Sequence, residues 1–398
     1  MHLVESYALQ AGAKISNPFI YEKFFPLGIE KYITFQPNSK YQSKCYDYWQ
    51  DVIDEIKPQL EKRGISIVQI GTKEDKYYAG CYNTAGQTSI NQTAYIIKNS
   101  LLNLSVDSFS AHVASSYNIP IVCLYSNNYI NCVYPYWGDP NNKILLEPNR
   151  KNRKPNFSAV ENPKTINEIP VENIVEAIFK LLNINDYNFP YRTKYIGDLY
   201  LNRIIENVPN QIIDNSSLGI DSLVERMDLD FNEDVLHEQL KKCPCSIITN
   251  KRINRNLLNS FKGKIKELIY NIHSEKDIDI NFIEDIHFFN INGFVFTDAE
   301  DKELNNIKFK LLDYGIINSK NLPEKQIIED IISTNKDLYY KTSKFTLSKG
   351  KIYPSHFALE NSLNVENFEH RVIKIDKKTF SDKIFLRELD HFKIFWTK

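Results

Sequence analysis

The stretch SVDSFSAHVAS, residues 105–115, holds the side chains of this sequence that are best placed to do chemistry. Asp107 and Ser108 end an apolar run, and His112 stands about one turn into the helix that follows. The first N–H groups of a helix are unpaired and its dipole is positive there, so a diphosphate can bind. Ser108 would cap the helix or donate to phosphate, Asp107 would bind sugar hydroxyls, and His112 would donate to a phosphate or to a leaving oxygen. Taken alone, however, the residues favour a simple N-cap followed by a half-buried histidine.

The elements that must position these side chains alternate along the first half of the chain. Expected strands cover residues 32–35, 65–70, 101–106 and 119–125, and expected helices cover 46–63, 89–99 and 109–117. Such alternation predicts a parallel sheet with right-handed crossovers, in which ligands bind beyond the carboxyl ends of the strands. The turn QPNSKYQSK, the loop from Gly71 to Glu74 and the Asp107–Ser108 pair should therefore meet on one rim.

The second half also alternates, which predicts a second α/β domain. Expected strands cover 222–227, 245–249, 266–271, 293–297 and 315–317, and expected helices cover 233–242, 255–262, 279–289 and 300–313. Residues 337–398 form a more β-rich tail, residues 135–173 a long surface connection, and residues 183–192 the expected linker. We expect domains at 1–185 and 195–398.

Composition excludes several classes of function. The 398 residues carry 49 basic and 50 acidic side chains, and this balance gives no general attraction to nucleic acid or anionic membrane. No window offers the roughly 18 apolar residues of a membrane span, and the N-terminus lacks a signal-peptide pattern. Six scattered cysteines show no zinc spacing and indicate free thiols in a reducing cytosol.

Four ordered segments carry a family resemblance. SVDSFSAHVASSYNIPIVCLYS resembles the signature of the ADP-heptose:lipopolysaccharide heptosyltransferases, roughly Asp-Ser-Gly-x-x-His-x-Ala before a strand that contains proline. Upstream, YITFQPNSKYQSKCYDYW, ISIVQIGTKEDK and AGQTSINQTAYIIKNS resemble that family's motifs in the same order. The resemblance covers the nucleotide-sugar-binding half, about residues 1–182. It implies a GT-B-like glycosyltransferase with two Rossmann-like parallel-sheet domains.

The resemblance also assigns site residues. Carried over by position, the donor-binding residues are Ser39, Lys44, Gly71, Glu74, Thr88, Ser89, Asp107, Ser108 and His112. Asp107 and His112 would be the catalytic pair, with Asp107 on the donor sugar and His112 on the phosphate or the leaving group.

In the same family pattern Lys44, near Ser39, would neutralise the diphosphate, and Glu74 or Asp75 would hydrogen-bond the ribose. Thr88 would line the nucleotide pocket together with Ser89. Each residue has a plainer alternative: a solvated turn lysine, a charged loop, or helix caps, since Ser89 and Gln92 form a capping-box pattern. Transfer would need neither a metal nor another cofactor, because cationic side chains and helix dipoles can stabilise the departing diphosphate.

Two departures from the family pattern affect this interpretation. The family's glycine after Asp-Ser is Phe109 here, which changes how closely a phosphate can approach the backbone. The Phe109 ring could stack on a base or sugar, or pack inward. The usual N-terminal acceptor domain is also expected to be absent, since MHLVESYALQAG already resembles the family's interdomain segment. Residues 190–398 would then replace it, a second chain would supply it, or catalysis would be lost.

The second half offers no clear catalytic base. Asp228, Asp230 and Asp298 follow expected strands but are typical surface or capping acids. The segment from Thr249 to Arg252 could bind an anionic acceptor. The histidines His287, His356 and His370 carry no signal either.

The sequence therefore predicts a cytoplasmic glycosyltransferase, which could also be peripheral at the inner membrane face. It would move a sugar from a nucleoside diphosphate donor, ADP-type by resemblance, to a glycan or lipopolysaccharide-type acceptor by direct displacement. Three rivals stay open: a nucleotide-sugar-binding or assembly protein without turnover, a glycosyltransferase acting on DNA, which the near-zero charge disfavours, and an unrelated α/β enzyme such as a sugar epimerase.

Overall fold

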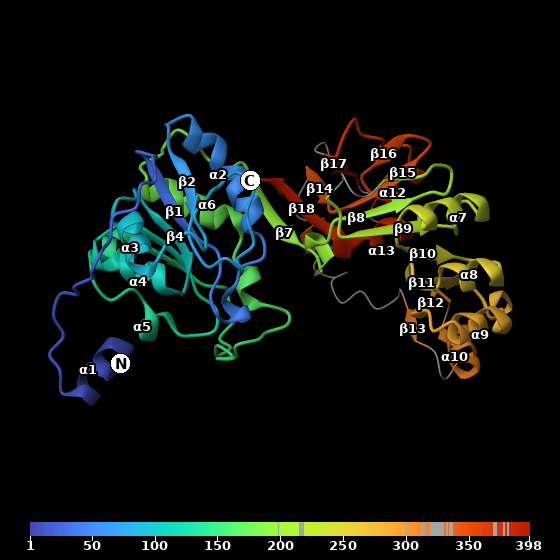
Figure 1. The fold of residues 1–398 in the computed structure, drawn as a ribbon, viewed down its shortest axis with the longest axis horizontal. Coiled ribbons are helices and arrows are strands. Elements are labelled where there is room, and N and C mark those ends of the chain that lie inside the picture. Colours follow the sequence, from blue (N-terminus) through green and yellow to red (C-terminus); the bar gives the residue numbers. More distant parts are fainter. Residues whose placement is uncertain are drawn as a thin grey trace. The chain divides into compact units, whose positions relative to one another are not determined.

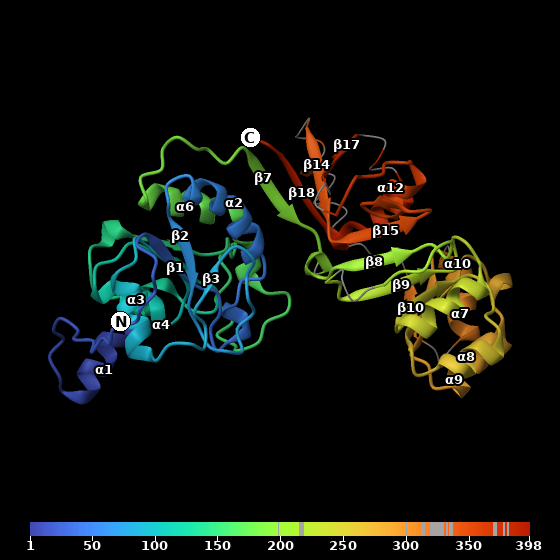
Figure 2. The same ribbon diagram turned by 45° about the horizontal axis from the view of Figure 1, so that its top comes forward.

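The chain folds into two compact units, residues 1–193 with Lys398 in the first and residues 194–397 in the second. The structure is a computed structural model that describes residues 1–197, 199–214, 219–299, 301–311, 315–318, 330–331, 333, 337–368, 372–376, 379 and 382–398. Figures 1 and 2 show that each unit is built around a sheet of its own. Both sheets are mainly parallel and carry helices, so the expected α/β class is confirmed.

The first unit contains a six-stranded sheet, in the order β3-β2-β1-β4-β5-β6, whose strands all run parallel. The strands are β1 (Tyr32–Gln36), β2 (Ser66–Gln69), β3 (Tyr82–Asn83), β4 (Asn103–Val106), β5 (Ile121–Leu124) and β6 (Lys143–Leu146). The chain moves outward from β1 to β3 and then crosses to β4 on the other side of β1. Ligands bind at the carboxyl ends of the strands beside such a reversal, which here is the β1–β4 boundary.

Helices cover both faces of this sheet. The helices of the unit are α1 (Leu3–Ala11), which has no buried residue, and α2 (Trp49–Glu61), α3 (Ile90–Lys98), α4 (Phe109–Ser116), α5 (Ile130–Val133) and α6 (Val171–Leu181). Helix α2 packs on α6 and α3 packs on α4, and Figure 2 shows the two pairs on opposite sides of the strands. The apolar spacing of α2 explains its position, because Val52, Ile56 and Leu60 are fully buried.

Residues 135–173 are not only a surface connection, as we had expected. Strand β6 lies within them and pairs with β5, from Ile121 opposite Lys143 to Leu124 opposite Leu146. Its sequence, KILL, is a short apolar run between segments rich in proline and asparagine. Such a run forms a strand only because the exposed edge of β5 offers it hydrogen-bonding partners.

The second unit contains an eight-stranded sheet in the order β13-β12-β11-β10-β9-β8-β15-β16. All neighbours are parallel except the β15–β16 hairpin. The strands are β8 (Ile204–Asn207), β9 (Ser222–Arg226), β10 (Cys245–Thr249), β11 (Ile265–Ile272), β12 (Gly293–Thr297), β13 (Ile316–Asn318), β15 (Lys344–Ser348) and β16 (Lys351–Tyr353). The expected strands from 222 to 317 are thus present, whereas β8 was not predicted.

The β-rich tail supplies more than the end of this sheet. A smaller sheet in the order β17-β14-β18-β7 combines β7 (Tyr191–Tyr195), β14 (Leu338–Thr342), β17 (Val372–Ile375) and β18 (Phe392–Thr397). The expected linker at 183–192 therefore runs into a strand, and the boundary between the units falls inside β7. Among the described residues of the unit, the α-helices are α7 (Glu233–Lys242), α8 (Arg255–Phe261), α9 (Ile280–Phe288), α10 (Asp301–Lys310), α12 (His356–Glu360) and α13 (Lys383–Arg387). In the part of the chain that the structure describes, no helix is both long and apolar enough to cross a membrane.

The two faces of the larger sheet differ in chemistry. Leu223 of β9, Ile247 of β10 and Leu268 of β11 belong to one apolar core with α7 and α9. Neighbouring positions on the strands point the other way, because side chains alternate along a strand. These positions include Glu206 of β8 and Arg226 of β9, which are buried charges.

Glu225 is an exception on the apolar side and gives a pH-dependent prediction. It is fully buried, and burial raises the pKa of its carboxyl to about 8, opposed by hydrogen bonds from Asn207 Nδ2 at 3.0 Å. The ordinary pKa of this carboxyl is 4.5, so above pH 4.5 the unfolded chain loses a proton that the folded protein still holds on Glu225. Stability should fall as the pH rises from about 4.5 to 8 and then level off.

Glu225→Gln should remove this pH dependence. At pH 8.5 we expect the second unit of the variant to be more stable than wild type by on the order of 4 kcal/mol, with little difference at pH 4.5. Urea unfolding followed by circular dichroism across this range measures the difference. Glu267→Gln, at an exposed position of β11, is the matched control and should leave the pH dependence of the free energy of unfolding unchanged. Parallel pH curves for wild type and Glu225→Gln would contradict the prediction.

Candidate functional site

The loops after β1, β2 and β4 meet at the carboxyl edge of the first sheet. Lys44 Nζ lies 2.6 Å from Asp107 Oδ2, joining the loop after β1 to the end of β4. Gln36 Nε2 donates to Ser108 Oγ at 3.2 Å, and Asn38 Nδ2 donates to Asp75 Oδ1 at 3.1 Å. The three loops therefore lie together on one rim, as the strand and helix alternation predicts.

A pocket of about 510 Å³ opens on this rim. Five of the predicted site residues line it: Ser39, Lys44, Asp107, Ser108 and His112. The start of α1 forms another wall through His2, Val4 and Tyr7. This volume is typical of a small-molecule site. Gly71, Glu74, Thr88 and Ser89 do not line this pocket.

The Lys44–Asp107 pair is largely withdrawn from water. The side chain of Lys44 is 14% exposed and that of Asp107 is 7% exposed. The Lys44 ammonium also lies over the ring of Tyr41, 5.7 Å from its centroid. A positive and a negative group are thus fixed side by side at the pocket, suited to a phosphate and to sugar hydroxyls respectively.

Side chains after β5 hold the loop that carries Lys44. Ser126 Oγ donates to the carbonyl of Ser43 at 2.7 Å, and Asn127 Nδ2 donates to Ser43 Oγ at 3.2 Å. Ser43 Oγ in turn donates to the carbonyl of Ser158 at 2.6 Å. We did not predict these residues. Their one signal in the sequence is that Ser126 and Asn127 directly follow an expected strand.

The start of α4 differs from the predicted anion site. Ser108 stands at the N-cap, but its side chain makes no capping hydrogen bond. Gln36 takes over this role: its Oε1 accepts from the N–H of Ser110 at 3.0 Å while its Nε2 donates to Ser108 Oγ. Of the two roles expected for Ser108, a side-chain cap is therefore absent, and a hydrogen bond to phosphate stays a prediction. Because one N–H of the first turn is already satisfied, less of the helix start is free to bind a diphosphate.

His112 is half-buried on the pocket wall. Burial is the main cause that lowers the pKa of its imidazole, and Lys44 and His2 lower it further, whereas Asp107 opposes them. The ring is therefore neutral at pH 7 and can donate one hydrogen bond but adds no positive charge. Neutralisation of a bound diphosphate would depend on Lys44.

The loop after β2 distinguishes Glu74 from Asp75. Asp75 Oδ2 accepts from the N–H of Thr72 at 2.7 Å, and its Oδ1 accepts from Asn38. The carboxylate crosses so close to Gly71 that a Cβ there would lie 2.1 Å from it. Glu74 is exposed and near Lys73. Glu74 is thus the carboxylate open to a ribose, and this role stays a prediction.

Thr88 and Ser89 serve the start of α3. Ser89 Oγ accepts from the N–H of Gln92 and the Gln92 side chain returns to the N–H of Ser89, so the predicted capping box is confirmed. Thr88 Oγ1 lies 2.8 Å from Thr93 Oγ1. Pocket lining by these two hydroxyls stays a prediction.

Two of the acids considered as bases in the second unit are held in ion pairs. Asp228 accepts from Arg226 Nε and Nη2, each at 2.8 Å. Asp298 accepts from His273 Nδ1 at 2.8 Å and pairs with Arg387. These partners outweigh the effect of burial and lower the pKa of Asp298. Neither acid is a free base.

The other candidates of the second unit are scattered. Asp230 is exposed on the turn after β9, and His287 lies near the end of α9. Arg252 donates to Asp285 at 2.7 Å, so the segment 249–252 has one of its charges already paired. His370 lies outside the described residues.

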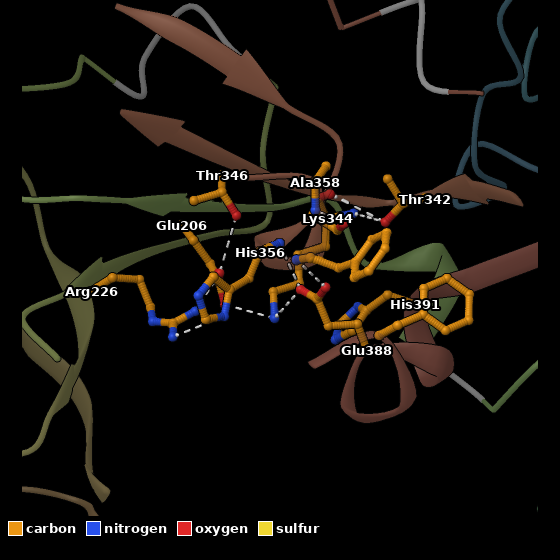
Figure 3. A network of polar contacts seen from close by, with 12 residues as sticks. Glu206, Arg226, Thr342, Lys344, Thr346, His356, Ala358, Glu388 and His391 are labelled. Atoms are coloured by element: carbon orange, nitrogen blue, oxygen red, sulfur yellow. Dashed lines mark hydrogen bonds and ion pairs between the residues drawn. The ribbon is translucent and has the colours of Figure 1, made fainter. Parts of the chain in front are cut away.

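A network of buried charges in the second unit was not predicted. Arg226 Nη1 lies 2.7 Å from Glu206, Lys344 Nζ lies 2.7 Å from Glu206, and Lys344 lies 3.3 Å from Glu388. With Asp228 these residues form what we call the charge network, and Figure 3 shows how Glu206 lies between Arg226 and Lys344. Glu388 accepts from the N–H groups of His356 and Phe357 and so fixes the start of α12. Each member of the charge network thus has an opposite charge within 3.3 Å.

Comparison with known families bears on the first unit. Residues 5–163 match glycosyltransferase family 9 (heptosyltransferase). The first unit thus resembles a family 9 glycosyltransferase. The resemblance expected from the four motifs is confirmed over these residues, whereas the second unit lies outside the match. No match is found among curated proteins.

Several solved structures align with the chain at low similarity. Escherichia coli ADP-heptose lipopolysaccharide heptosyltransferase II is 19% identical, with 46% of this chain and 52% of that chain covered and a TM-score of 0.31. A family 9 glycosyltransferase from Veillonella parvula is 18% identical, with 45% and 50% covered and a TM-score of 0.32. E. coli heptosyltransferase WaaC with ADP is 13% identical, with 44% and 54% covered and a TM-score of 0.32. This chain therefore spans about half the length of these structures.

Proposed function

We propose that the first unit binds a nucleoside diphosphate sugar in the pocket of Lys44, Asp107 and His112, and that the protein transfers the sugar to a glycan-type acceptor. The observation that carries this proposal is the Lys44–Asp107 pair, fixed at 2.6 Å on the pocket wall inside the segment that matches family 9. The ammonium suits the diphosphate and the carboxylate suits sugar hydroxyls. An ADP-type donor is the family expectation.

The residues suggest direct displacement. An acceptor hydroxyl oxygen attacks the anomeric carbon, the bond from that carbon to the diphosphate oxygen breaks, and the electron pair leaves with the diphosphate. Lys44 would stabilise the charge that grows on the leaving oxygen, because a preorganised cation in a partly buried site is effective there. His112, neutral at pH 7, would donate one hydrogen bond to the same group. The acceptor proton passes to a base that we leave unassigned.

Calorimetric titration with ADP, GDP, UDP and CDP and their common sugars tests this proposal. One diphosphate should bind to wild type, and His112→Ala should weaken its binding at least tenfold, a loss of about 1.4 kcal/mol. His237→Ala, on the exposed surface of α7 in the second unit, is the control and should bind as wild type does. No binding of any nucleotide by wild type would show that the pocket is not a donor site.

Nucleotide-sugar binding without turnover is the second candidate. The satisfied N–H of Ser110 and the ion pairs of Asp228 and Asp298 favour it, because they reduce the groups available for catalysis. Release of nucleoside diphosphate from a bound donor, in the presence of oligosaccharide acceptors, distinguishes the two. Turnover would exclude the binding-only function.

A further inference from the structure

Three aromatic rings are exposed inside the pocket of the first unit. Phe109 is 41% exposed, Tyr41 is 42% exposed and Tyr7 is 63% exposed, and all three line the pocket with Asp107 and His112. They come from different segments: the start of α4, the loop after β1, and α1. Rings that gather in a concave site present a flat apolar surface for a ligand.

Phe109 lies in the sequence between the two predicted catalytic residues, Asp107 and His112. It is the first residue of α4, directly after Ser108, and stands three residues before His112. Residues three apart share one face of a helix, so the ring and the imidazole border the pocket together. Asp107 stands two residues before Phe109 in the sequence, and the Lys44 ammonium, which pairs with Asp107, lies over the ring of Tyr41. An apolar face and a hydroxyl-binding carboxylate thus occur side by side.

This combination fits a sugar ring better than a nucleobase or a phosphate. A pyranose has one face made largely of C–H groups and carries hydroxyls around its edge, which match the rings and Asp107 respectively. The side chains expected to hold the nucleoside, Glu74, Thr88 and Ser89, do not line this pocket. Gln36 already occupies the N–H of Ser110, which weakens the case for phosphate at the start of α4.

We propose that Phe109, with Tyr41 and Tyr7, forms a stacking surface that holds the sugar ring of the donor. This inference rests on the proposed function and adds a specificity element to it. Lys44 would take the diphosphate, Asp107 the sugar hydroxyls, and Phe109 the apolar face of the ring. Phe109 would then add little to the affinity for a bare nucleoside diphosphate but much to the affinity for the sugar-bearing donor.

The test compares two ligands on wild type and on two variants of Phe109. Dissociation constants of the nucleoside diphosphate that binds and of its nucleotide sugar are measured by calorimetry for wild type, Phe109→Ala and Phe109→Tyr. Phe109→Ala should weaken the nucleotide sugar about tenfold and the bare diphosphate less than twofold, while Phe109→Tyr should retain both affinities. Because Phe109 is a partly exposed pocket residue, its removal leaves no core cavity, and circular dichroism confirms folding.

A matched control uses another exposed ring of the first unit. Phe157 is 55% exposed, pairs with Tyr129 at 5.9 Å between ring centroids, and does not line the pocket. Phe157→Ala should leave both dissociation constants unchanged. Equal weakening of both ligands by Phe109→Ala, or no weakening of either, would overturn the stacking proposal while leaving the donor site in place. Failure of wild type to bind any nucleotide would overturn the proposed function and this inference together.

Discussion

Replacing Arg226 with methionine should destabilise the second unit by about 3–5 kcal/mol, the largest loss of stability that we expect of any single substitution here. Arg226 is 8% exposed and Glu206 is 2% exposed. Methionine fills much of the space of the arginine stem but leaves the carboxylates of Glu206 and Asp228 without their main partner. A buried charge stripped of its partner keeps its desolvation cost, so the loss far exceeds that of a surface pair.

Hydrogen exchange measured by mass spectrometry on the full-length chain can locate this effect. Amides of β8 and β9 should exchange much faster in Arg226→Met, while those of the first unit should keep their wild-type rates. Lys241→Met removes an ion pair with Glu238, also at 2.7 Å, but on the exposed surface of α7. The free energy of unfolding of this control should fall by no more than about 1 kcal/mol. A similar small loss for Arg226→Met would show that the charge network contributes little.

The pH dependence of the same network has the opposite sign to that of Glu225. Burial would raise the pKa of Glu206, but the charges of Arg226 and Lys344 outweigh it and hold the pKa well below its ordinary value. A carboxyl with a depressed pKa stabilises the fold at neutral pH and loses this contribution as the pH falls below about 4.5. As the pH falls below about 4.5, the free energy of unfolding should therefore decrease more steeply for wild type than for Arg226→Met.

Sequence patterns alone did not reveal the charge network. Glu206, Arg226, Lys344 and Glu388 are far apart in the chain, and each looks like an ordinary polar residue on its own strand or turn. The first three meet through the pairing of β8 with β9 and through the pairing of β8 with β15, which sets Thr346 opposite Glu206. That pairing joins strands separated by more than a hundred residues, and nothing in the local sequence specifies it.

The rim of the first unit was more predictable because local patterns determine most of it. Apolar runs gave β1, β2, β4 and β5, and their parallel order places their carboxyl ends at one edge. Lys44 and Asp107 could therefore be expected to meet. The roles of Gln36 and Asn127 could not, because a polar side chain can reach several partners and only the folded chain selects one. The residue pattern offered Ser108 as a helix cap, whereas Gln36 from β1 accepts the hydrogen bond from the N–H of Ser110.

Lys44→Met should abolish most of the proposed activity, lowering kcat/KM for the donor by about 100- to 1000-fold, as expected when a charge-stabilising group is removed. The neutral His112 cannot replace its charge. In addition, Asp107 would be left nearly buried without its cation, and would repel an incoming diphosphate. Lys40 also lines the pocket but is exposed, so Lys40→Met is the control and should lower the same ratio only a few-fold.

A double-mutant cycle separates the two ways in which Lys44 could act. If Lys44 neutralises the diphosphate, Lys44→Met with Asp107→Asn should still bind the nucleoside diphosphate weakly, because the missing charge is not restored. If Lys44 only compensates Asp107, removing both charges should recover wild-type affinity, and the role in phosphate binding would be excluded. The pair is in contact, so a coupling of 0.5–3 kcal/mol is expected. Calorimetry with the nucleoside diphosphate alone is the decisive readout, since it reports charge neutralisation without any contribution from the sugar subsite.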